Sequence, residues 1–502
     1  MRKSWIGALA VAFALTGCAT LPRQVHKYRS EALTDPTSTA LGRIVANCKS
    51  GPNLSGVRLL ASGDEALASL IALADHAERT LDIQYYIIQQ DDSARILLQH
   101  VRLAAMRGVR VRLLVDDLNT AGEDRHFMHL GKLAHVEVRV FNPFPGGRSA
   151  MWSRVLAAVS EIPRINHRMH NKLFVADNAL AITGGRNIGD QYFTRDKLSN
   201  FIDLDVIAAG TIVSQLSASF DAFWNSKYAY PIAAIAAPVS EESVPHVLTE
   251  TADPVAAWLA RELDSSKLSL EWVPASVLAD RPAKISRVSS LDQEETIAND
   301  ITTLMRSAKQ EVIVISPYFV PGRAGVNLMR DLVARGVHIR ILTNSLASTD
   351  SALVYKGYSR YREDLLKLGV ELAEVRPKLG VKRARFHPFR SANARLHAKA
   401  VVIDQKTVFI GSLNMDARSA RTNSELGLVI RSSEIAGQVT SLLDDISADG
   451  SYKLDWDEQR KRIRWHSGDA GSVRTWYREP ETTALQRFAL RVFAPFAPED
   501  ML

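Results

Sequence analysis

Cysteine is scarce in this chain: Cys18 and Cys48 are the two in 502 residues. Two cysteines are too few for a disulfide framework or a cysteine-based metal centre. The 13 histidines include no H-E-x-x-H pair of the kind that binds zinc, so a zinc site has no support either. We therefore expect chemistry that needs no metal, or a site that the sequence does not reveal.

The N-terminal region lacks a hydrophobic run long enough to cross a bilayer, because the apolar stretch from Trp5 to Leu15 falls short of the ~20 residues that such a helix needs. It follows Arg2 and Lys3, an order typical of a secretory signal peptide. Its end, Leu15-Thr16-Gly17-Cys18, resembles a bacterial lipoprotein box, in which Cys18 would be acylated. The pattern predicts a lipoprotein of the bacterial cell envelope, anchored to a membrane and facing the periplasm. An ordinary signal with an incidental cysteine is the alternative.

Acidic residues are outnumbered: 62 Lys and Arg stand against 55 Asp and Glu, a formal net charge of +7. This balance suits anionic lipid or nucleic acid and does not choose between them. Between Val375 and Ile403 the chain has eight Lys or Arg and no Asp or Glu. That stretch either gathers anionic headgroups or forms a solvated basic loop.

One motif occurs twice. H-x-K-x-x-x-x-D runs from His170 to Asp177 and again from His397 to Asp404, and each copy is followed by a small-residue pair and an asparagine, Asn187 or Asn414. Matched residues lie 227 positions apart, which indicates an internal duplication. Polar histidines at strand ends are the bland alternative, but they do not explain two copies in register.

The spacing within the motif has a physical reason. Lys172 to Asp177 and Lys399 to Asp404 predict short apolar strands, in which side chains alternate between faces, so the His and Lys of each copy share a face. A neutral imidazole can attack phosphorus, and an ammonium beside it neutralises phosphate oxygens. One copy would supply a nucleophile and the other an acid. The two aspartates lie at the far ends of these strands and are expected to brace the repeat interface or a turn.

Helical patterns alternate with strand patterns in both halves: helices at 64–78, 93–107, 294–308 and 325–335, and strands at 81–88, 109–115, 311–316 and 337–343. This alternation predicts two α/β halves with mixed central sheets flanked by helices. The predicted boundaries are a signal peptide at 1–17, a tether at 18–55, a first half at 56–235, a linker at 236–290, a second half at 291–450 and a C-terminal extension at 451–502. The linker is expected to cover the halves with one helix near 254–263.

The C-terminal extension ends in a short amphipathic pattern. Leu485, Phe488, Val492 and Phe493 fall on one helical face. Such a helix either lies on a membrane or docks against its own domain.

The sequence resembles the phospholipase D superfamily over roughly residues 60 to 450, with both motifs intact. Within it, the chain is similar to the bacterial cardiolipin synthases of the C type. The supporting segments are Leu81-Asp82-Ile83-Gln84-Tyr85-Tyr86, Arg168-Met169-His170-Asn171-Lys172, Gly184-Gly185-Arg186-Asn187-Ile188-Gly189-Asp190, Ser316-Pro317-Tyr318-Phe319-Val320-Pro321 and Leu342-Thr343-Asn344-Ser345-Leu346.

The resemblance implies that the halves pack about a pseudo-two-fold axis and build one active site. His170 would form a phosphatidyl-histidine, and His397 would protonate the leaving alcohol and then activate the acceptor. Asp203 and Glu425 would orient the histidines. The phosphate would be held by the remaining polar residues of the two motifs and the asparagines that follow: Lys172, Lys399, Asn187 and Asn414. No cofactor is implied.

The implied reaction passes a phosphatidyl group to phosphatidylglycerol and produces cardiolipin, with either phosphatidylglycerol or phosphatidylethanolamine as the donor. Hydrolysis to phosphatidic acid, nuclease activity and a lipid-binding protein without catalysis are the alternatives. Complete motifs argue against loss of catalysis, and the predicted lipid anchor argues against nucleic acid as a partner. Neither feature separates transfer from hydrolysis.

Overall fold

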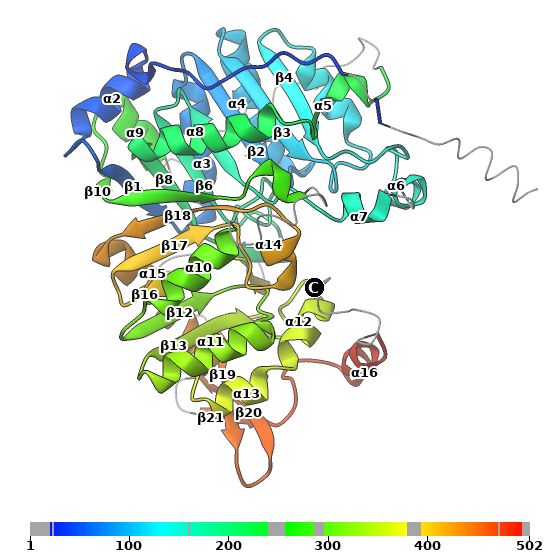
Figure 1. The fold of residues 1–502 in the computed structure, drawn as a ribbon, viewed down its shortest axis with the longest axis vertical. Helices are drawn as coiled ribbons and strands as arrows, with labels where there is room; N and C mark the ends of the chain where they lie inside the picture. The colour runs from blue at the N-terminus through cyan, green and yellow to red at the C-terminus, as the bar shows by residue number, and fades with distance from the viewer. Residues whose placement is uncertain are drawn as a thin grey trace, which may run out of the picture.

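Two open sheets, each flanked by helices, lie one above the other (Figure 1). The computed structural model of the chain describes residues 21–22, 25–158, 161–238, 257–285, 296–378, 393–469 and 472–493. The predicted signal peptide, Cys18, residues 239–256 and residues 379–392 of the basic stretch lie outside these ranges. Among the described helices, none combines the length and the apolar composition that a bilayer crossing requires.

The first sheet has the strand order β10-β1-β8-β6-β5-β2-β3-β4-β9. Strands β2, β3 and β4 are parallel, and the other pairs are antiparallel. The strands are β1 Ser55–Leu60, β2 Thr80–Tyr85, β3 Arg110–Asp116, β4 Val136–Phe141, β5 Leu173–Ala176, β6 Leu180–Gly184, β8 Asp205–Gly210, β9 Ala229–Pro231 and β10 Glu271–Val273. The helices of this half are α3 Gly63–His76, α4 Asp92–Met106, α5 Asp124–Gly131, α6 Met151–Ala157, α7 Ile162–Ile165 and α8 Thr211–Trp224, with the 3-10 helix η3 Ile232–Ala234.

The second sheet repeats this plan with the order β11-β18-β17-β16-β12-β13-β14-β19-β20-β21. Its parallel strands are β12, β13 and β14. The strands are β11 Ala275–Ala279, β12 Glu311–Ile315, β13 His338–Asn344, β14 Glu371–Val375, β16 Ala400–Ile403, β17 Thr407–Gly411, β18 Leu426–Arg431, β19 Ser451–Asp457, β20 Arg462–Asp469 and β21 Ser472–Trp476. The helices are α10 Ile297–Arg306, α11 Gly322–Ala334, α12 Ala352–Ser359, α13 Arg362–Lys367, α14 Ala417–Arg421 and α15 Ser433–Asp449, with η4 Pro282–Ile285 before them. The duplicated α/β fold is therefore confirmed.

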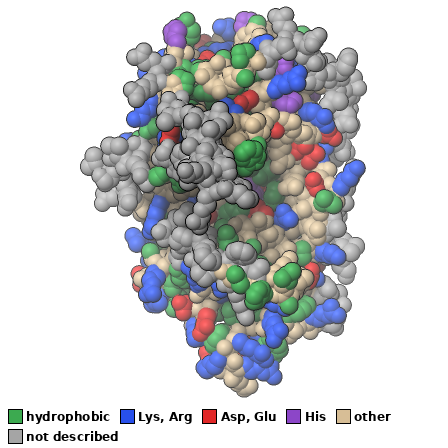
Figure 2. Space-filling model, turned by 90° about the vertical axis from the view of Figure 1, so that its right-hand side faces the viewer, with side chains coloured by type: hydrophobic (Ala, Val, Ile, Leu, Met, Phe, Trp, Pro, Cys, Tyr) green, Lys and Arg blue, Asp and Glu red, His purple; other side chains and the backbone are tan. Residues whose placement is uncertain are grey.

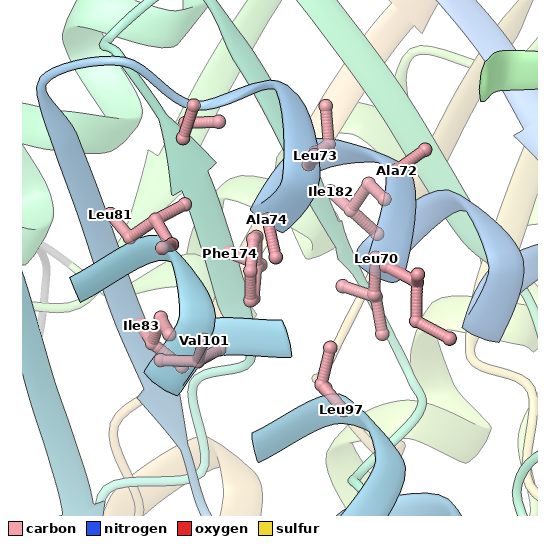
Figure 3. Close-up of a cluster of buried hydrophobic side chains, with 14 of the residues drawn as sticks. Leu70, Ala72, Leu73, Ala74, Leu81, Ile83, Leu97, Val101, Phe174 and Ile182 are labelled. Carbon is pink, nitrogen blue, oxygen red and sulfur yellow. The ribbon is translucent and has the colours of Figure 1, made fainter. Parts of the chain in front are cut away.

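Each half buries an outer helical layer against its sheet. In the first half, α3 and α4 cover the sheet with side chains such as Leu70, Leu97 and Val101, which meet Phe174 and Ile182 of the strands (Figure 3). These strands are buried on both faces, which explains their nearly continuous apolar sequences.

The inner faces of both sheets share one core. Residues of α8 and α15 pack in it with residues on and beside the strands of both halves, including Leu173, Leu204, Ile313 and Leu396. The halves are thus parts of one hydrophobic structure.

The segment predicted to be a tether is docked in its described part, which corrects that prediction. Helix α2, Ala40–Cys48, follows η1, Pro36–Ser38, and buries Leu41, Ile44 and Val45 in the core of the first half. Before it, Ser30 accepts from Arg112 and its amide donates to Asn225. Helix α2 has only nine residues, so its apolar positions are too few to form a sustained helical periodicity in the sequence.

The linker and the C-terminal extension also contribute to the sheets. The linker holds α9, Trp258–Asp264, close to the predicted helix, but its strands β10 and β11 also form one edge strand in each sheet. Strands β19 to β21 of the extension widen the second sheet. The final helix α16, Ala484–Phe493, packs through Leu490 on the core between the second sheet and its outer helices, and leaves Leu485 and Phe488 exposed.

Candidate active site

Each motif histidine is paired with a carboxylate from the other half of the chain. The Nδ1 atom of His170 lies 2.9 Å from Oε2 of Glu425, and Nδ1 of His397 lies 2.6 Å from Oδ2 of Asp203. Both acids are fully buried, and each histidine is 7% exposed. The predicted histidines and orienting acids therefore meet in one site, and their pairing crosses between the halves.

Backbone pairing between the halves produces this crossing. Strand β15, Asn393–Leu396, runs parallel to β7, Ser199–Ile202, which sets His397 beside Asp203 at the end of this two-stranded sheet. In the equivalent place, Met169 forms a parallel bridge with Ser424, and the His170 amide donates to the Ser424 carbonyl at 2.9 Å. Each motif histidine is therefore positioned by main-chain hydrogen bonds across the repeat interface.

The residue before each histidine is fixed by a polar side chain at the end of a parallel strand. The carboxylate of Asp116, at the end of β3, accepts from the Met169 amide at 2.9 Å. Asn344, at the end of β13, accepts from the Leu396 amide and donates to its carbonyl, both at 2.9 Å. These positions correspond in the duplication, but one is Asp and the other Asn, so a comparison of motifs did not find them.

The two lysines share the buried site with the histidines, and both are 1% exposed. Nζ of Lys172 donates to the His170 carbonyl at 2.5 Å, and Nζ of Lys399 donates to the His397 carbonyl. Burial, followed by repulsion from Lys399, lowers the pKa of Lys172 to about 7. Burial also lowers the pKa of Lys399. Two ammonium groups held in so little water are well placed to attract an anion.

Burial has the same direction of effect on the histidines. It lowers the pKa of His170 to about 4 against the attraction of Glu425. Burial, then Lys399, lowers the pKa of His397. Burial alone would raise the pKa of Asp203, but His397 and Lys399 bring it to about 2. At neutral pH both imidazoles are therefore neutral and donate from Nδ1 to an ionised acid. Nε2 of His170 is left for chemistry, and Nε2 of His397 lies 3.3 Å from Nζ of Lys399.

Aromatic rings form part of the wall around both histidines. Tyr86 meets the His170 ring edge-on, with centroids 4.9 Å apart, and Tyr192 meets the His397 ring at 5.2 Å. Phe201 also packs on His397, at 4.9 Å. These rings contribute to the burial that lowers the pKa of each imidazole.

The asparagines predicted to bind phosphate are both at the site but differ in their partners. Asn187 accepts from the Ile87 amide and donates to the Tyr192 hydroxyl at 2.9 Å. The Oδ1 atom of Asn414 is buried and has no hydrogen-bond partner among the residues that the structure describes. Asn187 thus positions Tyr192 beside His397, whereas the side-chain oxygen of Asn414 is not used in a hydrogen bond with the described residues.

The motif aspartates lie away from the histidines and brace turns, as expected. Both adopt left-handed backbone conformations, with φ of 53° and 51°. Asp177 accepts from three successive amides, those of Glu78, Arg79 and Thr80, at the start of β2. Asp404 makes the equivalent contacts with the amides of 309–311 before β12. Each aspartate therefore joins the turn after its motif strand to the start of the neighbouring strand.

The halves differ beside the two acids. A Cβ atom at Gly185 would lie 2.1 Å from Oδ1 of Asp203, so glycine leaves room for this carboxylate. The matching residue, Ser412, donates to Oε2 of Glu425. The linker adds a further contact: Asp280 accepts from the Glu425 amide at 2.9 Å and donates its own amide to the Glu425 carbonyl at 3.0 Å. The longer Glu425 is therefore held by two residues that sequence reasoning missed.

Paired H-x-K-x-x-x-x-D motifs on two α/β halves, with each histidine bound to an acid across the interface, define a phospholipase D fold and site. A family model described as "Cardiolipin synthase, PLD-like domain" matches residues 70–224 and 301–446. The chain belongs to this family. Among the described residues, no group of three or more His, Cys, Asp or Glu is arranged to hold a metal ion.

Similar proteins agree with this assignment. The chain is 37% identical to cardiolipin synthase C of Escherichia coli (strain K12) over 469 residues, which span 91% of this chain and 98% of that protein. It is 28% identical to cardiolipin synthase A of Pseudomonas fluorescens over 421 residues, or 82% and 74% of the two chains. The solved phosphatidylserine synthase of Haemophilus influenzae Rd KW20 has a TM-score of 0.58 and 14% identity, covering 92% of this chain and 100% of that one, a likeness of fold.

Proposed function

We propose that this protein is a phosphatidyltransferase that forms cardiolipin from phosphatidylglycerol through a phosphohistidine intermediate. The observation that carries the proposal is the pair of neutral, carboxylate-bound imidazoles in one buried site with two lysines. The similarity to cardiolipin synthase C over nearly the whole of both chains supports the substrate class.

In the first step, Nε2 of His170 forms a bond to phosphorus while the bond to the leaving alcohol breaks. His397 gives its proton to that alcohol, so the donor phospholipid becomes phosphatidyl-histidine and free glycerol or ethanolamine. An anionic phosphate between the lysines raises the pKa of His397 and allows it to carry this proton. In the second step, His397 takes the proton of a phosphatidylglycerol hydroxyl, whose oxygen replaces His170 on phosphorus.

The role of each histidine can be tested with a phosphodiester whose leaving group is p-nitrophenolate, which departs without a proton. We expect His397→Ala to release one equivalent of p-nitrophenol in a burst and to accumulate phosphohistidine at His170. His170→Ala should give no burst. A burst in His170→Ala and none in His397→Ala would reverse the roles, and an absence of phosphohistidine in both would reject the covalent mechanism.

Product analysis separates transfer from hydrolysis. Purified protein given phosphatidylglycerol, with or without phosphatidylethanolamine, is expected to yield cardiolipin and glycerol or ethanolamine. Phosphatidic acid as the main product would make the protein a hydrolase. Hydrolysis is the rival because water can open the same intermediate.

We also propose that the protein is a membrane-anchored lipoprotein of the cell envelope, acylated at Cys18 and facing the periplasm. The support is the apolar run that ends at Leu15-Thr16-Gly17-Cys18. Mass spectrometry of the mature N-terminal peptide tests this proposal, and an unmodified Cys18 or an intact Met1 would reject it.

A further inference from the structure

Large hydrophobic side chains are exposed on both sides of the active site. Twelve such residues are exposed in the described chain, and half of them fall into two groups. The first group lies on and beside α6 and α7: Met151, Trp152 and Ile162, which are 41%, 70% and 48% exposed. The second lies on α16: Leu485, Phe488 and Val492, at 75%, 64% and 45%. These six residues are called the apolar rim.

The topology places both groups at the C-terminal ends of the parallel strands, which form the edge of the sheets where the site lies. Helices α6 and α7 belong to the connection from the end of β4 to His170, and Asn142 at the end of β4 donates to the carbonyls of Arg164 and His167. Helix α16 packs on α12, which follows the end of β13. Figure 1 shows α6, α7, α12 and α16 along one side of the molecule. Figure 2 faces that side, where hydrophobic side chains border a hollow near its centre.

The N-terminal strap, residues 27–33, leads to the same edge. The Leu33 carbonyl accepts from Asn178, which lies in the turn after β5, at the opposite ends of the strands. Nζ of Lys27 donates to the Ala229 carbonyl at 2.9 Å, and Ala229 pairs with Phe141 at the end of β4. The strap therefore crosses the first half, and Lys27, at its start, lies at the edge that holds the rim.

We propose that the apolar rim docks on the surface of a phospholipid bilayer and holds the active-site opening against it. The inference rests on the proposed function, in which donor and acceptor are both bilayer lipids. A basic chain whose exposed apolar side chains gather at the edge that holds the site fits an anionic bilayer. Helix α16 lies outside both segments matched by the family model, so half of the rim is an addition to the shared domain.

Kinetics with two substrates test the rim. Leu485→Ser with Phe488→Ser is expected to lower turnover of phosphatidylglycerol in vesicles by tenfold or more, since burial of each side chain in lipid is worth roughly a factor of ten in partitioning. Turnover of bis-p-nitrophenyl phosphate, which is dissolved in water, should stay unchanged. The matched control is Leu103→Ser with Met106→Ser, which alters exposed apolar residues of α4 at the opposite edge and should change neither rate.

Direct contact is measured by fluorescence of Trp152. Protein carrying His170→Ala is placed on phosphatidylglycerol vesicles with brominated acyl chains, and the Trp152 signal is taken as the difference from the same protein with Trp152→Phe. Quenching is the expected result. Absence of quenching, a rim variant that matches the control variant on vesicles, or an equal loss on the dissolved substrate would overturn the proposal. Loss of a dimer in the rim variant, without any change on vesicles, would assign the surface to a second copy instead.

These results are separable from the reaction itself. Quenching of Trp152 requires no turnover, so phosphatidic acid as the product would reject cardiolipin synthesis and leave the docking surface standing. Cardiolipin formation with no effect of the rim variant would do the reverse.

Discussion

The Nδ1–carboxylate contact sets the tautomer of each imidazole, and thereby leaves the Nε2 lone pair for the reaction. Replacing Asp203 by Asn keeps the shape but removes the charge that fixes His397. We expect Asp203→Asn to lower kcat by on the order of 10²–10⁴-fold without loss of folding. Steady-state kinetics and circular dichroism measure the two quantities. A near-normal kcat would show that His397 does not depend on the acid of the other half.

Glu425 is held more extensively than Asp203, and this difference can be tested. Ser412→Ala removes the hydroxyl that donates to Glu425, but the Asp280 contacts to the backbone remain. We expect a loss in kcat that is much smaller than that of Glu425→Gln, whose kcat should fall as in Asp203→Asn. Equal losses in both variants would show that Ser412 itself takes part in the chemistry.

The lowered pKa values predict a bell-shaped profile of kcat/KM against pH. His170 attacks when it is neutral, so activity should rise as pH passes the folded pKa of His170, about 4. Lys172 binds the anion when it is charged, so activity should fall as pH passes its pKa, about 7. Lys172→Arg should move the alkaline limb to higher pH, because guanidinium stays charged, even if the maximum falls. An alkaline limb that does not move would assign it to another group.

At the scale of elements, Asp177 and Asp404 connect the strand pairs that carry the motifs. Each accepts from consecutive amides, and removal of the carboxylate leaves donors without partners. We expect Asp177→Ala to lower the free energy of unfolding by about 2–4 kcal/mol, since one buried amide and two partly buried amides lose their acceptor. Asp404→Ala should cost less, because the amides of 309 and 310 are exposed to water. Urea denaturation measures both, and turnover per folded molecule should change little.

Much of this architecture was predictable from the sequence. Periodicity and spacing predicted the alternation of helices and strands and the repeat. They also predicted that the motif aspartates brace a turn. The ends of β12 agree closely, since it was expected at 311–316 and spans Glu311–Ile315, whereas β2 was expected to reach residue 88 and ends at Tyr85. Local patterns determine such features because each depends on neighbours within a few residues.

The crossed pairing could not be predicted in this way. Asp203 follows His170 in the first half, and Glu425 follows His397 in the second, so sequence distance favours pairs within each half. The actual pairs depend on β7 meeting β15, a contact between strands almost 200 residues apart. The edge strands of the linker were missed for the same reason, since each is only three to five residues long and is stabilised by its sheet.

At the scale of the molecule, the shared inner core ties the halves together. Separating the chain within 239–256 would expose residues such as Leu204 and Leu396 to water. We expect residues 1–238 alone and 257–502 alone to be inactive and poorly soluble, and co-expression of both to restore cardiolipin synthesis. Lipid analysis of the expressing cells measures the outcome. Activity of either half alone would contradict a site built from both.

The crossed acids also bear on how such a chain could arise. A single half, one histidine and one acid, could complete this site only by pairing with a copy of itself, and that dimer would have two identical arms. Fusion into one chain removes the requirement that the arms stay identical. The sequence has used that freedom: Gly185 is matched by Ser412, Asp116 by Asn344 and Asp203 by Glu425. In a dimer, each substitution would change both copies of the site, whereas in the fused chain it changes only one. One half can therefore specialise for the departure of the first alcohol and the other for the arrival of the second.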